Sequence, residues 1–138
     1  MKKILLVSMM QNVTEILKKV EPELTGKTVT YIPTAALGED DGGNTFFLLQ
    51  ELKRTGADQM LIREVNLGKV YIGESAGAIV ACPDIGYSTV MDAPEKAPDL
   101  SDYSALSLVD FYAVPTLETG RWEPRLRRLS ENMDRRLS

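Results

Sequence analysis

The segment Tyr71–Ala78 reads Y-I-G-E-S-A-G-A, and it decides the fold class of this 138-residue chain. The apolar run Lys69–Ile72 comes before the G-E-S-A-G sequence, and the apolar run Ala78–Ala81 comes after it. A G-x-S-x-G sequence between a strand and a helix is the pattern of a nucleophile elbow, a sharp turn that projects a serine hydroxyl from a sheet. The pattern therefore predicts an α/β domain with Ser75 at a helix N-terminus, where negative charge is favoured.

Other segments extend this strand and helix into a layered domain. We expect strands at Lys3–Ser8, Thr28–Pro33, Lys69–Ile72 and Leu108–Val114, and helices at Val13–Leu24, Asn44–Arg54, Asp58–Val65 (capped by Asp58) and Glu123–Leu137. Alternating strands and helices of this kind predict a mostly parallel sheet of about four strands, with helices on both faces. Ligands of such sheets bind beyond the carboxyl ends of the strands, so Ser75 and the Gly42–Asn44 loop should reach that edge.

Composition bounds the class of protein. A chain of this length is expected to form one domain, residues 1–138, and its net charge of −4 favours neither nucleic acid nor an anionic membrane. The segment 121–138 is rich in arginine and carries a net charge of +3. Its apolar residues repeat at helical spacing, which predicts an amphipathic helix that either packs on the sheet or pairs with a second copy.

The cysteine and histidine counts exclude several kinds of site. Cys82 is the single cysteine, so no disulfide forms within the chain, and this suits a cytoplasmic location. We expect no metal and no cofactor, because the chain has no histidine and its carboxylates lack ligand spacing. The missing histidine also conflicts with the serine motif, since a serine nucleophile normally needs an imidazole base.

Several segments in order resemble peptidase E, a family of serine peptidases related to cyanophycinase. The resemblance is carried by G-G-N-T-F at Gly42–Phe46, by Y-I-G-E-S-A-G-A at Tyr71–Ala78, and by V-D-F at Val109–Phe111 leading to Pro115. It implies a three-layer α/β/α fold similar to class I glutamine amidotransferases and flavodoxins. It also implies a serine peptidase that acts on small Asp-containing dipeptides.

The resemblance assigns roles to individual residues. Ser75 would be the nucleophile, and backbone N–H groups at the Gly42–Asn44 loop and at Ala76 would hold the oxyanion. Asp92 is the closest match to the acid that orients the base. The family's histidine follows a proline, and here Thr116 follows Pro115, so the base is missing.

The chain also departs from the family in length. Only Ala36–Asp41 spans the gap that holds a further helix and strand in peptidase E, and the part after the histidine position is largely replaced by the arginine-rich helix. These departures indicate a shortened relative, and threonine at the histidine position, Thr116, indicates that its activity is impaired. The alternative is an inactive or engineered mini-domain that serves as a scaffold, binds a ligand or associates with itself. A shortened sheet leaves an unpaired edge, so a homodimer or strand-swapped assembly is expected.

Each candidate also has an ordinary structural interpretation. Ser75 could simply cap a helix, and Gly42–Asn44 could be a loop ending in an asparagine cap. Asp92 could be a solvated carboxylate of an irregular segment. Four other acidic residues compete with it for an acid role: Glu74, Asp84, Asp99 and Asp102.

Overall fold

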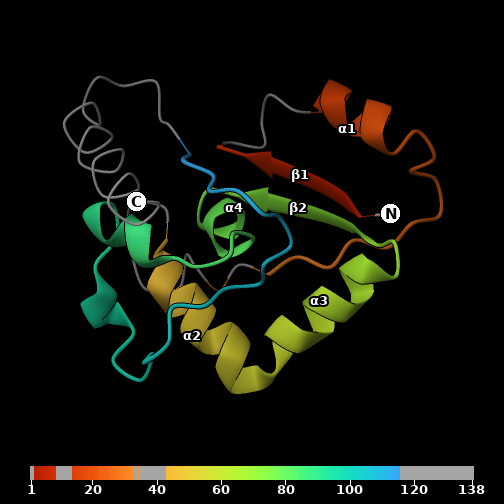
Figure 1. The fold of residues 1–138 in the computed structure, drawn as a ribbon. Coiled ribbons are helices and arrows are strands. Elements are labelled where there is room, and N and C mark those ends of the chain that lie inside the picture. Colours follow the sequence, from red (N-terminus) through yellow and green to blue (C-terminus); the bar gives the residue numbers. More distant parts are fainter. Residues whose placement is uncertain (1, 9–13, 33, 35–42, 116–138) are drawn as a thin grey trace.

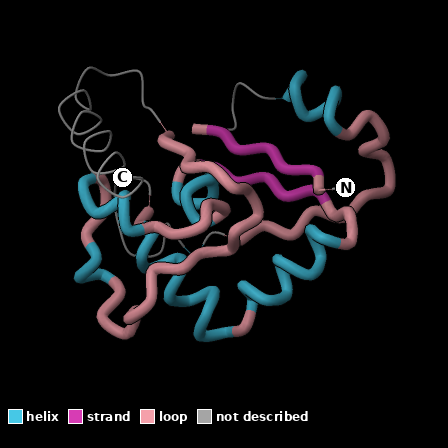
Figure 2. Tube along the Cα trace, viewed as in Figure 1, coloured by secondary structure: helices cyan, strands magenta, loops and turns pink. Residues whose placement is uncertain are grey.

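The computed structural model describes residues 2–8, 14–32, 34 and 43–115. Its two strands, β1 (Lys3–Val7) and β2 (Val70–Glu74), run parallel and are paired along their whole length (Figure 1). The helices among the described residues are α1 (Thr14–Val20), α2 (Thr45–Thr55), α3 (Ala57–Asn66), α4 (Ala76–Val80) and the short 3-10 helices η3 (Gly86–Val90) and η4 (Pro94–Lys96). Figure 2 shows that a long irregular segment follows α4 and contains both 3-10 helices.

The core lies between the strands, α4 and α2. Helix α4 packs against both strands, and α2 packs against α4, α3 and η4. The fully buried side chains come mainly from α2, from α4 and from the segment after α4, and the largest apolar ones are Phe46, Leu49, Val80 and Ile85. Burying such side chains contributes roughly 1.5–3 kcal/mol each, so most of the packing energy is located around the β2–α4 unit.

Helix α2 shows how local sequence sets the boundaries of an element. Its buried residues Phe46, Leu49 and Leu52 lie three apart and form one apolar face. Asn44 caps the N-terminus, because its side chain accepts a hydrogen bond from the N–H of Phe47. Gly56 ends the helix in the left-handed conformation at φ 76° and also precedes α3, so the predicted capping role of Asp58 is wrong.

Two of the predicted strands are absent from the described residues. Residues 28–32 form no strand, and Val29 and Tyr31 are 84% and 79% exposed. A β-branched sequence becomes a strand only where a neighbouring strand accepts its hydrogen bonds, and none is paired with it in the described part of the chain. The parallel sheet there contains two strands rather than about four.

The segment Leu108–Val114 is also irregular, for a different reason. The N–H of Leu108 donates to the carbonyl of Ala81 at 2.9 Å, and that of Leu106 donates to the carbonyl of Val80, also at 2.9 Å. Its start is therefore bound to the end of α4 instead of a strand edge. The predicted helix Glu123–Leu137 lies outside the described residues.

Buried Glu21 fastens the turn after α1 to the sheet. Its carboxylate pairs with the ammonium group of Lys27 at 2.7 Å and with that of Lys3, on β1, at 3.0 Å. The hydrogen bonds from Lys27 and Lys3 lower the pKa of Glu21 below its ordinary value. No helix in the parts of the chain described here is long and apolar enough to span a membrane.

Candidate functional site

Ser75 occupies a strained turn between the end of β2 and the start of α4. Its backbone has φ 50° and ψ −110°, a region that residues with a Cβ rarely adopt. A conformation of this kind costs about 1–3 kcal/mol and persists only where the surroundings fix it. The strand, turn and helix around Ser75 follow in the order that the G-x-S-x-G pattern predicts.

Backbone hydrogen bonds hold this turn on both sides. The N–H of Ser75 donates to the carbonyl of Val7, the last residue of β1, at 3.0 Å. The carbonyl of Ser75 accepts from the N–H groups of Ala78 and Ile79 at 2.9 and 3.2 Å. The serine backbone thus links the end of β1 to the first turn of α4, and its side chain is half-buried.

The two glycines of the motif have different surroundings. A Cβ on Gly73 would lie 2.5 Å from the carbonyl oxygen of Gly77 and 2.9 Å from the nitrogen of Ala78, which are both backbone atoms. A Cβ on Gly77 would meet only the hydroxyl of Tyr71, at 3.8 Å. Steric contact therefore requires a glycine at position 73 and permits a side chain at position 77.

Tyr71 makes a contact that the sequence pattern does not reveal. Its hydroxyl donates to the carbonyl oxygen of Gly77 at 2.6 Å, across the serine turn. Burial raises the pKa of this hydroxyl well above its usual range, so it stays protonated at neutral pH and can donate. The sequence held one indication of this contact. Tyr71 and Gly73 lie two residues apart in a strand, so both face the same side of the sheet.

The candidate oxyanion donors lie at or just before the N-termini of two helices. Ala76 is the first residue of α4, a position whose N–H has no acceptor within the helix. Gly43 has φ 96° and leads into Asn44, which is fully buried at the N-terminus of α2. Gly42 lies outside the described residues. Helices α2 and α4 are in contact with each other.

The side chain of Asn44 is engaged by the protein itself. Besides capping α2, its amide nitrogen donates to the carbonyl of Ala93 at 3.0 Å. Its structural interpretation as a helix cap is therefore correct. Any contribution of Asn44 to substrate binding would come from its backbone.

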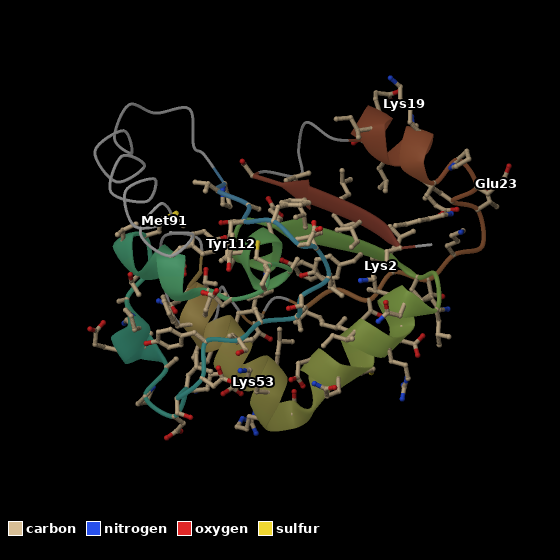
Figure 3. The ribbon with its side chains drawn as sticks, in the orientation of Figure 1. Lys2, Lys19, Glu23, Lys53, Met91 and Tyr112 are labelled. Atoms are coloured by element: carbon tan, nitrogen blue, oxygen red, sulfur yellow. The ribbon has the colours of Figure 1, made fainter. Side chains whose placement is uncertain are left out.

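The side chain of Asp92 reaches the N-terminus of α2. Its carboxylate accepts hydrogen bonds from the N–H of Thr45, at 2.9 Å, and from the Thr45 hydroxyl. Met91, labelled in Figure 3, directly precedes it at the end of η3. Sequence reasoning missed Thr45, although threonine next to a helix cap is a plausible hydrogen-bonding partner for an acidic residue.

The competing carboxylates have other surroundings. Asp84 accepts from the hydroxyl of Tyr112, which is labelled in Figure 3, at 2.8 Å. Asp102 accepts from the N–H and the hydroxyl of Ser104, and these hydrogen bonds lower its pKa. Glu74 ends β2 and is exposed, as is Asp99.

Thr116, the position matched to the family's histidine, lies outside the described residues. In the portions of the chain that the structure describes, no three acidic or cysteine side chains gather as a metal site would require. The candidate residues that the structure describes are thus a strained serine, residues at two helix N-termini and a carboxylate.

Known proteins resemble this chain in sequence and in fold. The sequence profile of peptidase family S51 matches residues 40–137. An uncharacterised peptidase of Listeria innocua is 39% identical over 159 residues, which cover 83% of this chain and 76% of the relative. Because that alignment is longer than the 138-residue chain, the relative contains internal residues that have no counterpart here.

Two further likenesses concern peptidase E itself. The peptidase E of Salmonella typhimurium is 33% identical over 125 residues, and the chain spans only 54% of its length. A crystal structure of a candidate peptidase E from Listeria monocytogenes matches with a TM-score of 0.87 and 34% identity, over 96% of this chain and 87% of that one. This likeness shows a flavodoxin-like α/β fold.

Proposed function

This chain belongs to peptidase family S51, and we propose that Ser75 is the nucleophile of a slow, peptidase E-like site for Asp-containing dipeptides. The observation that carries the proposal is the backbone of Ser75, held at φ 50° between β2 and α4. Strain of this kind at a polar residue is typical of functional sites. A serine that served only as a helix cap would use an ordinary extended conformation and a side-chain hydrogen bond, and Ser75 has neither.

The chemistry follows the usual course of acyl transfer. The Ser75 oxygen attacks the carbonyl carbon of the peptide bond, and the electron pair of the C=O bond moves to the oxygen. The N–H groups of Gly43 and Ala76 stabilise that oxyanion. Its collapse re-forms the C=O bond and breaks the C–N bond, and the released amine takes up a proton. Water then attacks the acyl-enzyme, and the serine is regenerated.

The hydroxyl proton is the difficulty in this chain. No histidine exists in the sequence, so the proton must pass to water or to a weaker base. Losing the base of a serine peptidase costs about 10⁶ in kcat. We therefore expect Ser75 to react with strong electrophiles and to turn over peptides very slowly.

Labelling with a fluorophosphonate probe tests the reactivity of Ser75. We expect a covalent adduct at Ser75 that the Ser75→Ala variant lacks. Ser107→Ala is the matched control, because Ser107 is exposed and also has a positive φ, 49°, but lies outside the serine turn. An adduct of equal yield on the Ser75→Ala variant would overturn the proposal, and so would a complete lack of labelling of the original chain.

A second experiment concerns the missing base. By the resemblance, Thr116→His places an imidazole at the family's histidine position. A general base contributes roughly 10²–10⁴-fold, so hydrolysis of an Asp-containing dipeptide should rise by at least about 10². Loss of that gain in the Thr116→His, Ser75→Ala double variant would assign the activity to Ser75.

The absence of histidine also favours a second candidate function, a binding or self-associating domain that keeps the fold without turnover. The labelling experiment separates the two. An unreactive Ser75 in a folded chain would support the binding domain.

A further inference from the structure

Two neighbouring residues beyond η3 hold two neighbouring residues at the start of α2. Asp92 accepts from the N–H of Thr45 at 2.9 Å and from its hydroxyl. Next to this contact, the Asn44 amide donates to the carbonyl of Ala93 at 3.0 Å. Residues about 48 positions apart in the sequence are thus joined twice. One contact is made by a side chain of the α2 segment and the other by a side chain of the segment beyond η3.

One side of this pair of contacts is sheltered from water. Asn44 and Thr45 are both fully buried, whereas Asp92 is half-buried and Ala93 is exposed. A carboxylate at a helix N-terminus is stabilised by the helix dipole and by charge-assisted hydrogen bonds, which are about twice as strong as neutral ones. In addition, the N–H of Asp92 donates to the carbonyl of Ser88 at 2.9 Å, so the carboxylate is carried by an anchored backbone.

The contacts act on the last residue of the candidate oxyanion loop, Asn44, and on the residue after it, Thr45. Gly43 directly precedes Asn44 and has φ 96°, a conformation open to glycine and to few other residues. Gly43 is joined directly to this segment, so how firmly Asn44 and Thr45 are held limits the positions that the Gly43 N–H can reach.

We propose that Asp92 is a positioning residue, which fixes the start of α2 and so orients the N–H of Gly43 toward the oxyanion. This role differs from that of an acid orienting a base, which the resemblance implies for Asp92. It rests on the proposed function for its effect on Ser75, but the contact itself can be measured independently. A carboxylate in this role acts through hydrogen-bond geometry, and an amide of the same shape can replace it in part.

Amide hydrogen exchange of the full chain, followed by NMR, tests the contact directly. Asp92→Ala removes the acceptor of the Thr45 N–H. We expect the exchange rate of the Thr45 amide to rise at least about tenfold. Asp92→Asn keeps an oxygen that accepts from this N–H, so its exchange should stay within a few-fold of the original rate. The Leu52 amide, in the middle of α2, reports global unfolding, so its exchange should accelerate less than that of Thr45 in Asp92→Ala.

Probe labelling then tests the link to Ser75. The second-order rate of fluorophosphonate labelling should fall with Asp92→Ala and recover largely with Asp92→Asn. Glu95→Ala is the matched control, because it removes an exposed carboxylate from η4 and should leave both rates unchanged. Equal loss of labelling in the alanine and asparagine variants would show that the charge matters, and would overturn the positioning role.

The two measurements keep the two proposals apart. Unchanged Thr45 exchange in Asp92→Ala would overturn the positioning role, even if Ser75 reacts well. Accelerated exchange with normal labelling would show that the contact exists but does not serve Ser75, and would likewise overturn it. A chain whose Ser75 never reacts would refute the proposed function, and with it the catalytic consequence of the Asp92 contact.

Discussion

Replacing Gly73 by alanine tests the geometry of the serine turn most directly. The new Cβ would lie 2.5 Å from the oxygen and 2.7 Å from the carbonyl carbon of Gly77, and 2.9 Å from the nitrogen of Ala78. Optimal separation of non-bonded carbon atoms is about 3.5–4.0 Å. All three atoms belong to the backbone, so no side chain can rotate away to make room.

The size of the effect follows from what must move. The first turn of α4 is fastened by the Tyr71 hydroxyl and by the two N–H groups that bind the Ser75 carbonyl. Overpacking a rigid site costs about 1–3 kcal/mol, and we expect the upper part of that range, about 2–3 kcal/mol. At about 4 °C per kcal/mol for a chain of this size, the Tm should fall by roughly 8–12 °C.

Thermal unfolding followed by circular dichroism measures this change, and Gly77→Ala is the matched control. The alanine Cβ at position 77 meets only the Tyr71 hydroxyl, at 3.8 Å, and lies inside α4. Alanine is better than glycine in a helix by up to about 1 kcal/mol, so this variant should melt at or above the original Tm. The reasoning would be refuted if Gly73→Ala melted within about 2 °C of the original chain, or if both variants lost equal stability.

Three further substitutions test other contacts of the described residues. Tyr71→Phe removes the hydrogen bond to the carbonyl of Gly77 and should lower the free energy of unfolding by about 1–2 kcal/mol in urea denaturation; no change would mean that water replaces the hydroxyl. Glu21→Gln breaks both ion pairs of this side chain, and its effect should depend on pH. Because the folded pKa of Glu21 is below the ordinary 4.5, the carboxylate stabilises the fold above pH 4.5 and loses this contribution as the pH falls through the folded pKa. The difference in Tm between the original chain and Glu21→Gln should therefore shrink on acidification, and a difference that stays constant to pH 2 would contradict this. Asn44→Ala removes the cap of α2 and should cost about 1–2 kcal/mol, whereas Asn44→Asp should retain much of the cap; equal losses would show that the contact to the Ala93 carbonyl dominates.

The serine turn was predictable because its determinants are local. Glycine at position 73 and the apolar runs on both sides of the motif are enough to predict strand, turn and helix. The same holds for α2, where Asn44 and Gly56 mark the two boundaries and the apolar residues repeat at helical spacing.

The strand predictions at 28–32 and Leu108–Val114 failed because a strand is not a local object. Both sequences are rich in residues that favour β-structure, but a strand needs a neighbour at the right edge. One of these segments is left exposed, and the start of the other is bound to the end of α4.

By itself, the sequence determined where the serine turn and the capped helix α2 lie, since residues within a few positions of one another specify both. Only the tertiary structure decided that Tyr71 reaches across the turn to Gly77 and that Asp92 reaches the start of α2. The Asp92 contact joins residues almost fifty positions apart in the sequence. Its partner is selected by the packing of α2 against the segment that contains η4, which no local pattern encodes.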